Sequence, residues 1–121
     1  MNRVLIVDDA CFMRSTISMM LKRNGFEIVG EAENGIEGVK KYNELRPDIV
    51  TMDITMPELS GLDALKLIKK IDPKANVIMV SAMGQELLVR EAVLNGAKSF
   101  VVKPFKEEQV VKAIKKVLSN N

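Results

Sequence analysis

The 121-residue chain has no histidine, no tryptophan and only one cysteine, Cys11. The lack of histidine excludes most nucleophilic triads and removes the most common catalytic base. A single cysteine cannot form a disulfide within the chain, which fits a reducing cytoplasm. Because Cys11 has neither a histidine nor a second cysteine to activate it, we expect a small buried thiol rather than a redox or thiol-enzyme group.

The sequence also lacks long apolar runs and a strong excess of one charge. No segment approaches the about 20 apolar residues that a membrane span requires, and strand-like sequence begins by Arg3, which leaves no room for a signal peptide. The net charge is only +2, so electrostatics do not require a nucleic-acid partner. With 47% hydrophobic and 28% charged residues, the composition is typical of one soluble globular domain. We expect a cytoplasmic protein that binds neither membranes nor nucleic acids.

Strand-like segments alternate with helix-like segments along the whole chain. Short apolar runs rich in β-branched residues are typical of strands buried on both faces of a parallel sheet. They occupy 4–7, 49–52, 77–80 and 100–102, and a weaker strand pattern covers 27–32. Strands each followed by a helix, with right-handed crossovers, predict an α/β fold with a doubly wound five-stranded parallel sheet, a (βα)5 domain. The least hydrophobic strand, 27–32, suits an edge, so the predicted strand order is the flavodoxin-like 2-1-3-4-5.

Capping residues mark the starts of two predicted helices. Asn34 precedes Glu37 by three positions, and Ser60 stands in the same relation to Asp63, which is the spacing of a capping pair. The last two helices are predicted near 85–94 and 106–118. The residues expected on the inner side of the helix after Asn34 are Ile36, Val39 and Tyr42.

Polar side chains stand at the ends of four predicted strands: Asp8 and Asp9, Asp53, Ser81 and Lys103. Parallel strands all end at the same edge of a sheet, where ligands bind, so we expect these groups to share one crevice. Carboxylate oxygens are the ligands that Mg²⁺ prefers. For the aspartate doublet alone, a solvated turn that caps the first helix is an equally good interpretation.

Asp53 adds a reactive group to this crevice. A carboxylate beside a metal held by two others should stay ionised and would attack a phosphoryl group, giving an aspartyl phosphate. The simpler interpretation of Asp53 is a third metal ligand or a loop cap. Ser81 would donate to one phosphoryl oxygen and Lys103 would pair with another, although taken singly they would be a helix cap and a solvated lysine. The sequence has no GxxxxGK or GxGxxG motif, which argues against nucleotide binding by those routes.

Taken together, these motifs resemble the receiver domain of two-component response regulators. The resemblance covers the full chain and is strongest to the single-domain chemotaxis regulators. The motifs that carry it are Val7-Asp8-Asp9, Asp53-x-x-Met56-Pro57-x-x-x-Gly61, Val80-Ser81-Ala82, Gly96-Ala97 and Val102-Lys103-Pro104-Phe105. It implies a phosphoacceptor at Asp53. It also implies a Mg²⁺ site formed directly by Asp9, Asp53 and the backbone carbonyl of Thr55, and mainly through water by Asp8.

The resemblance also implies the parts of a switch. Lys103 takes the position of the phosphate-binding lysine and Ser81 that of the switch hydroxyl, both with catalytic roles. Phe100 falls at the aromatic switch position, which tyrosine often occupies. The peptide bond between Lys103 and Pro104 is expected to be cis.

The partners follow from the same resemblance. A separate histidine kinase of the chemotaxis type would supply the phosphoryl group to a protein that is not itself a conventional enzyme. Only Ser119-Asn120-Asn121 follow the last predicted helix, so we expect 1–121 to be a single, monomeric receiver domain without an output domain. Its target would be a flagellar motor switch protein or, in an archaeal system, an adaptor protein. The residues expected to make the last helix basic toward an acidic partner, or simply well solvated, are Lys106, Lys112, Lys115 and Lys116.

Two other functions remain open from the sequence. One is a phosphorelay intermediate, which would pass the phosphoryl group to a histidine phosphotransfer protein. The other is a Mg²⁺-dependent phosphatase of the haloacid dehalogenase type, which also forms an aspartyl phosphate. That class has a second aspartate two residues after the nucleophile, where this chain has Thr55, so the sequence argues against it.

Overall fold

The computed structural model describes residues 2–120. Its strands form one sheet in the order β2-β1-β3-β4-β5, and every neighbouring pair is parallel. The predicted fold class and strand order are confirmed. The strands are β1 (Arg3–Val7), β2 (Glu27–Ala32), β3 (Ile49–Asp53), β4 (Val77–Ser81) and β5 (Ser99–Val102).

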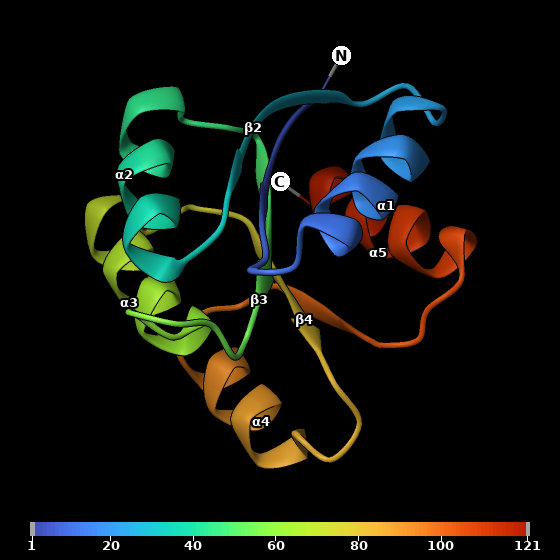
Figure 1. Cartoon of the computed structure of the whole chain (residues 1–121). Coiled ribbons are helices and arrows are strands. Elements are labelled where there is room, and N and C mark those ends of the chain that lie inside the picture. The colour runs from blue at the N-terminus through green and yellow to red at the C-terminus, as the bar shows by residue number, and fades with distance from the viewer. Residues whose placement is uncertain (1, 121) are drawn as a thin grey trace.

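Within the described residues, each strand is followed by one helix. Figure 1 shows α1 and α5 together on one side of the sheet, α2 and α3 on the other, and α4 next to α3 below the end of β4. No helix in the described part of the chain has the length and apolarity needed to cross a membrane. The helices are α1 (Cys11–Lys22), α2 (Gly35–Leu45), α3 (Gly61–Ile71), α4 (Glu86–Leu94) and α5 (Glu107–Ser119).

Two apolar cores lie on the two faces of the sheet. Alternate residues of β1 enter different cores, Leu5 on the side of α2, α3 and α4, and Ile6 on the side of α1 and α5. Both β3 and β4 are buried over their whole length, whereas the edge strand β2 is partly exposed. Burial on both faces is the physical reason for the continuous apolar runs of β1, β3 and β4. The run at 100–102 was expected to be buried in the same way, but β5 is the other edge of the sheet and leaves Phe100 and Val102 exposed.

The predicted helix caps are confirmed. The Asn34 side chain accepts a hydrogen bond from the backbone N–H of Glu37 at 2.8 Å, which starts α2. The Ser60 hydroxyl accepts one from the backbone N–H of Asp63 at 3.2 Å, which starts α3. The helices α4 and α5 each begin one residue later than predicted, at Glu86 and Glu107.

Two predictions for single residues are also wrong. Ile36 was expected on the inner side of α2, but 54% of its surface is exposed. The helix buries Gly35, Gly38 and Tyr42 instead, and Gly38 packs closely against Val7 of β1. Cys11 was expected to be buried, but it is the first residue of α1 and is exposed at the edge of the sheet. A helix start at a strand end faces solvent, and this position outweighs the usual tendency of free cysteines to be buried.

Candidate functional site

The three predicted carboxylates meet where β1 and β3 end. One oxygen from each of Asp8, Asp9 and Asp53 lies within 4.8 Å of the other two. The parallel pairing of Val7 with Met52 brings the two strand ends level. Asp8 and Asp53 are buried, with 1% and 7% of their surface exposed, whereas Asp9 is exposed. The result is an acidic cluster that opens to solvent on the Asp9 side.

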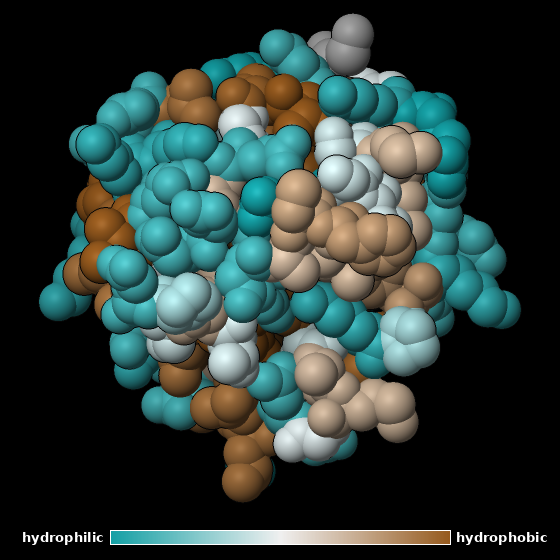
Figure 2. Space-filling view, viewed as in Figure 1, coloured by the Kyte–Doolittle hydropathy of each residue, from teal (hydrophilic) through white to brown (hydrophobic). Residues whose placement is uncertain are grey.

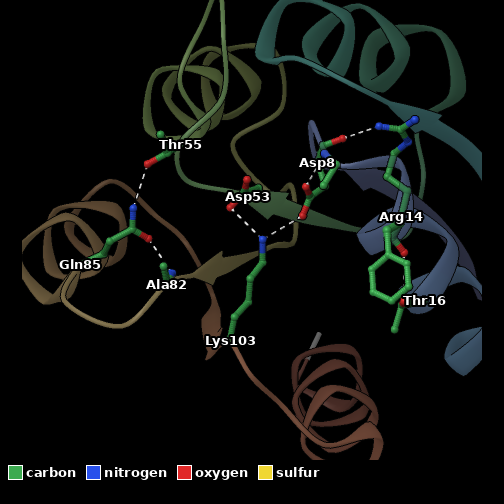
Figure 3. Close-up of polar contacts among 10 residues, drawn as sticks. Asp8, Arg14, Thr16, Asp53, Thr55, Ala82, Gln85 and Lys103 are labelled. Atoms are coloured by element: carbon green, nitrogen blue, oxygen red, sulfur yellow. Dashed lines mark hydrogen bonds and ion pairs between the residues drawn. The ribbon is translucent and has the colours of Figure 1, made fainter.

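Lys103 brings a positive charge to the two buried carboxylates. Its Nζ atom donates a hydrogen bond to Asp8 Oδ2 at 3.2 Å and lies 3.5 Å from Asp53 Oδ1 (Figure 3). The backbone N–H of Lys103 donates to the Ser81 carbonyl at 2.7 Å, which fixes the base of this side chain beside β4. The Lys103–Pro104 peptide bond is cis, as the resemblance implies.

The environment of Asp53 disfavours its charged form in the absence of a metal. Burial raises the pKa of Asp53 to about 6, and the negative charge of Asp8 acts in the same direction. Lys103 opposes this shift but does not cancel it. Asp53 is therefore mostly ionised at neutral pH, at a cost in free energy that an additional cation would reduce.

The chain leaves β3 in a tight path that holds the Asp53 backbone in place. The N–H of Ile54 donates to the Val80 carbonyl at 3.2 Å, and the N–H of Gly61 donates to the Ile54 carbonyl at 2.6 Å. A Cβ atom on Gly61 would lie 1.8 Å from the Asp53 carbonyl oxygen, so only glycine allows this approach. The start of α3 thus packs directly against the strand end that carries Asp53.

Ser81 and Phe100 line one groove from neighbouring strands, at positions that share one face of the sheet. The groove has a volume of about 610 Å³ between α4 and β5 and is lined mainly by apolar side chains. Ser81 is buried, and its hydroxyl has no hydrogen-bond partner among the described residues, which leaves a donor free at the end of β4. Phe100 is 46% exposed, so its ring lies toward solvent rather than in the core.

The structure adds two residues that the sequence analysis did not select. Arg14 donates from Nη1 to the Asp8 carbonyl at 2.7 Å and forms an ion pair with Glu31 at 3.2 Å. Gln85 bridges the loops after β3 and β4, since it accepts from the Ala82 N–H at 2.6 Å and donates to the Thr55 hydroxyl at 2.8 Å (Figure 3). A carboxamide four residues after a strand-end serine was the only sequence signal for Gln85.

The carboxylate cluster suits a hard divalent cation. Mg²⁺ takes a few protein oxygens and keeps several waters, and the exposed side of Asp9 leaves space for them. Two buried carboxylates so close together also repel each other, and a cation between them would relieve that repulsion. Thr55, whose backbone carbonyl the resemblance adds to this set, lies on the exposed loop two residues beyond Asp53. The residues present therefore fit Mg²⁺.

Comparison with known proteins gives consistent matches over nearly the whole chain. A model of the response regulator receiver domain family matches residues 4–115. The chemotaxis protein CheY of Thermotoga maritima is 59% identical over 116 residues, which cover 96% of this chain and 97% of that protein. CheY of Bacillus subtilis is 58% identical over 118 residues, which cover 98% of each chain.

A solved structure has the same fold. The crystal structure of the CheX–CheY–BeF3–Mg²⁺ complex from Borrelia burgdorferi matches with a TM-score of 0.92 and 41% sequence identity. The match covers 96% of this chain and 88% of that chain.

Proposed function

Because the chain belongs to the response regulator receiver domain family, we propose that it is a phosphorylation-controlled switch in chemotaxis signalling, with Asp53 as the phosphoacceptor. The observation that carries the proposal is the placement of Lys103 between the buried carboxylates Asp8 and Asp53, with Asp9 completing the cluster. A purely structural ion pair needs one acid, whereas this site gathers three.

The reaction at Asp53 is a phosphoryl transfer from a phosphohistidine of a separate kinase. An Asp53 carboxylate oxygen forms the new bond to phosphorus, and the bond from phosphorus to the imidazole nitrogen breaks with its electron pair staying on that nitrogen. Mg²⁺, when bound by Asp8, Asp9, Asp53 and the Thr55 carbonyl, would offset negative charge on the carboxylates and the phosphoryl oxygens. The Lys103 ammonium, at the end of β5, would offset the same negative charge.

The protein would respond through the groove between α4 and β5. The Ser81 hydroxyl at the end of β4 has no hydrogen-bond partner among the described residues, and we expect it to move toward a phosphoryl oxygen. Its movement would open space in the groove that Phe100 also lines, and the Phe100 ring would then turn inward. The protein would thus change between two packing arrangements of Ser81 and Phe100. The phosphoryl group favours one arrangement only through contacts that differ between the two.

The partners are proposed on the same basis. The donor is a histidine kinase of the CheA type, and the target is a flagellar motor switch protein or, in an archaeal system, an adaptor. Residues 1–121 would act as one monomeric cytoplasmic receiver domain, with output by protein binding and without contact to nucleic acid or membrane. The high similarity to chemotaxis proteins CheY from two organisms supports this pathway.

Small phosphoryl donors test the proposal without a cognate kinase. Acetyl phosphate should label the protein in the presence of Mg²⁺, because a positioned acceptor carries out its own chemistry. Addition of EDTA should abolish the labelling. Labelling that is absent with Mg²⁺, or equal with and without it, would contradict the proposed function.

A further inference from the structure

Gln85 makes two contacts that the proposed reaction does not explain. It precedes α4 as its N-cap residue, yet its side chain makes no capping hydrogen bond to that helix. The carboxamide instead accepts from the Ala82 N–H at 2.6 Å and donates to the Thr55 hydroxyl at 2.8 Å. One side chain thus ties the start of α4 to both loops that flank Asp53 (Figure 3).

The Ala82 N–H faces the side of β4 on which β3 and Asp53 lie. The carbonyl of Ser81 accepts from the Lys103 N–H at 2.7 Å and therefore faces β5. In a trans peptide the C=O and the next N–H point in opposite directions, so the Ala82 N–H faces the β3 side, where Asp53 lies. The Gln85 oxygen now satisfies this donor. An oxygen of a group attached to Asp53 would compete for the same place.

The helix that Gln85 holds is weakly anchored. Only Val89 and Ala92 of α4 are buried, whereas α3 buries five residues. Leu87 and Leu94 are almost fully exposed, and Figure 2 shows apolar atoms gathered at the bottom of the view, over α4. Little apolar area would be lost if the start of this helix moved, so a pair of hydrogen bonds is a sizeable part of what fixes it.

We infer that the Gln85 carboxamide is a latch that holds the unphosphorylated arrangement of α4 by occupying the Ala82 N–H. This inference rests on the proposed phosphorylation of Asp53. A phosphoryl oxygen takes the Ala82 N–H, the carboxamide loses its donor, and the start of α4 is released from Thr55. Because the two contacts exclude each other, Gln85 must also lower the affinity of the site for the phosphoryl group. Gln85 is thus a positioning residue that sets the threshold of the switch.

The test is a titration with beryllofluoride, a phosphoryl mimic, at saturating Mg²⁺, followed by amide NMR signals of α4. Gln85→Met keeps the length of the side chain but removes both hydrogen bonds. Without the competing contact to the Ala82 N–H, the beryllofluoride concentration at the midpoint should fall by roughly three- to tenfold, the worth of one ordinary hydrogen bond. Mg²⁺ affinity should change little, because Gln85 contacts none of the carboxylates and bonds to the Thr55 hydroxyl rather than to its carbonyl.

Two further variants complete the experiment. Gln85→Ala should lower the midpoint as Gln85→Met does, which excludes an effect of the thioether itself. Glu86→Gln, a neighbouring exposed residue, should behave as the wild type. An unchanged or higher midpoint in both Gln85 variants, while the wild type binds, would overturn the latch and leave the proposed function intact. Failure of the wild-type protein to bind beryllofluoride at all would overturn both.

Discussion

Lys103 Nζ lies 3.2 Å from Asp8 Oδ2, although 95 residues of chain separate the two. The contact exists because β5 carries Lys103 to the same sheet edge at which β1 ends. It makes the acidic cluster a property of the folded sheet rather than of any local motif. The lysine neutralises only part of the charge there, and this partial neutralisation determines how the site should respond to metal, pH and substitution.

Asp9→Ala should weaken Mg²⁺ binding by about tenfold or more, because it removes one carboxylate from a set of three. The dissociation constant can be measured from Mg²⁺-dependent shifts of amide signals near Asp53. Asp63→Ala, which removes an exposed carboxylate from α3, serves as the matched control. Equal Mg²⁺ affinity in Asp9→Ala and the wild type would show that Asp9 is not a ligand.

The contribution of Asp53 to the stability of the metal-free protein should become more favourable as the pH is lowered from 7 toward 4. The pKa of Asp53 is about 6 in the folded protein and 3.8 ordinarily, so in this window the folded state binds more protons than the unfolded state. At pH 7 the ionised carboxylate should cost on the order of 2–3 kcal/mol.

Thermal unfolding of Asp53→Asn and of the wild type, both in EDTA, measures the free-energy cost of the ionised Asp53 carboxylate. The variant cannot ionise at this position, so it should be more stable than the wild type at pH 7. The two proteins should converge as the pH approaches 4. A wild type that loses stability relative to Asp53→Asn on acidification would reverse the sign and contradict the burial effect.

Ser81→Ala should leave the stability of the unphosphorylated protein nearly unchanged, because the buried hydroxyl makes no hydrogen bond that the variant would lose. The same variant should still bind beryllofluoride but show a reduced NMR response at Phe100 and α4. The stability and the NMR response together show whether Ser81 serves the fold or the switch. A full wild-type response around Phe100 would mean that the signal travels by another route.

Gly61→Ala should destabilise the fold by about 1–3 kcal/mol, since a Cβ atom there would overlap the Asp53 carbonyl and force the backbone to shift. The shift occurs at the strand end that carries Asp53, so Mg²⁺ affinity should fall together with stability. Urea unfolding and a Mg²⁺ titration on the same sample give both values. A variant with wild-type stability would show that the loop after β3 adapts at no cost.

Much of the fold and the site follows from the sequence because strand burial and strand ends have simple consequences. Continuous apolar runs located β3 and β4, and the common edge of parallel strands brought Asp8, Asp53 and Lys103 together. Capping chemistry located the starts of α2 and α3 in the same way.

The features that sequence reasoning missed depend on the exact rotation of a helix or the path of a loop. Ile36 is at a helical spacing that fits the core, but the rotation of α2 turns it outward. The contacts of Gln85 and Arg14 go to backbone groups or to a distant loop, and no residue pattern specifies such partners. The exposure of Cys11 depends on whether other segments cover the first turn of α1, and only the tertiary structure decides this.

The most direct test of the central claim is the position of the phosphoryl group. After incubation with acetyl phosphate and Mg²⁺, intact mass spectrometry should detect one added phosphoryl group on the wild-type protein and on Asp63→Asn. Asp53→Asn, which is nearly isosteric and lacks the nucleophilic carboxylate, should remain unlabelled while its amide spectrum shows an intact fold. Equal labelling of Asp53→Asn and the wild type would contradict the assignment of Asp53 and the switch built on it.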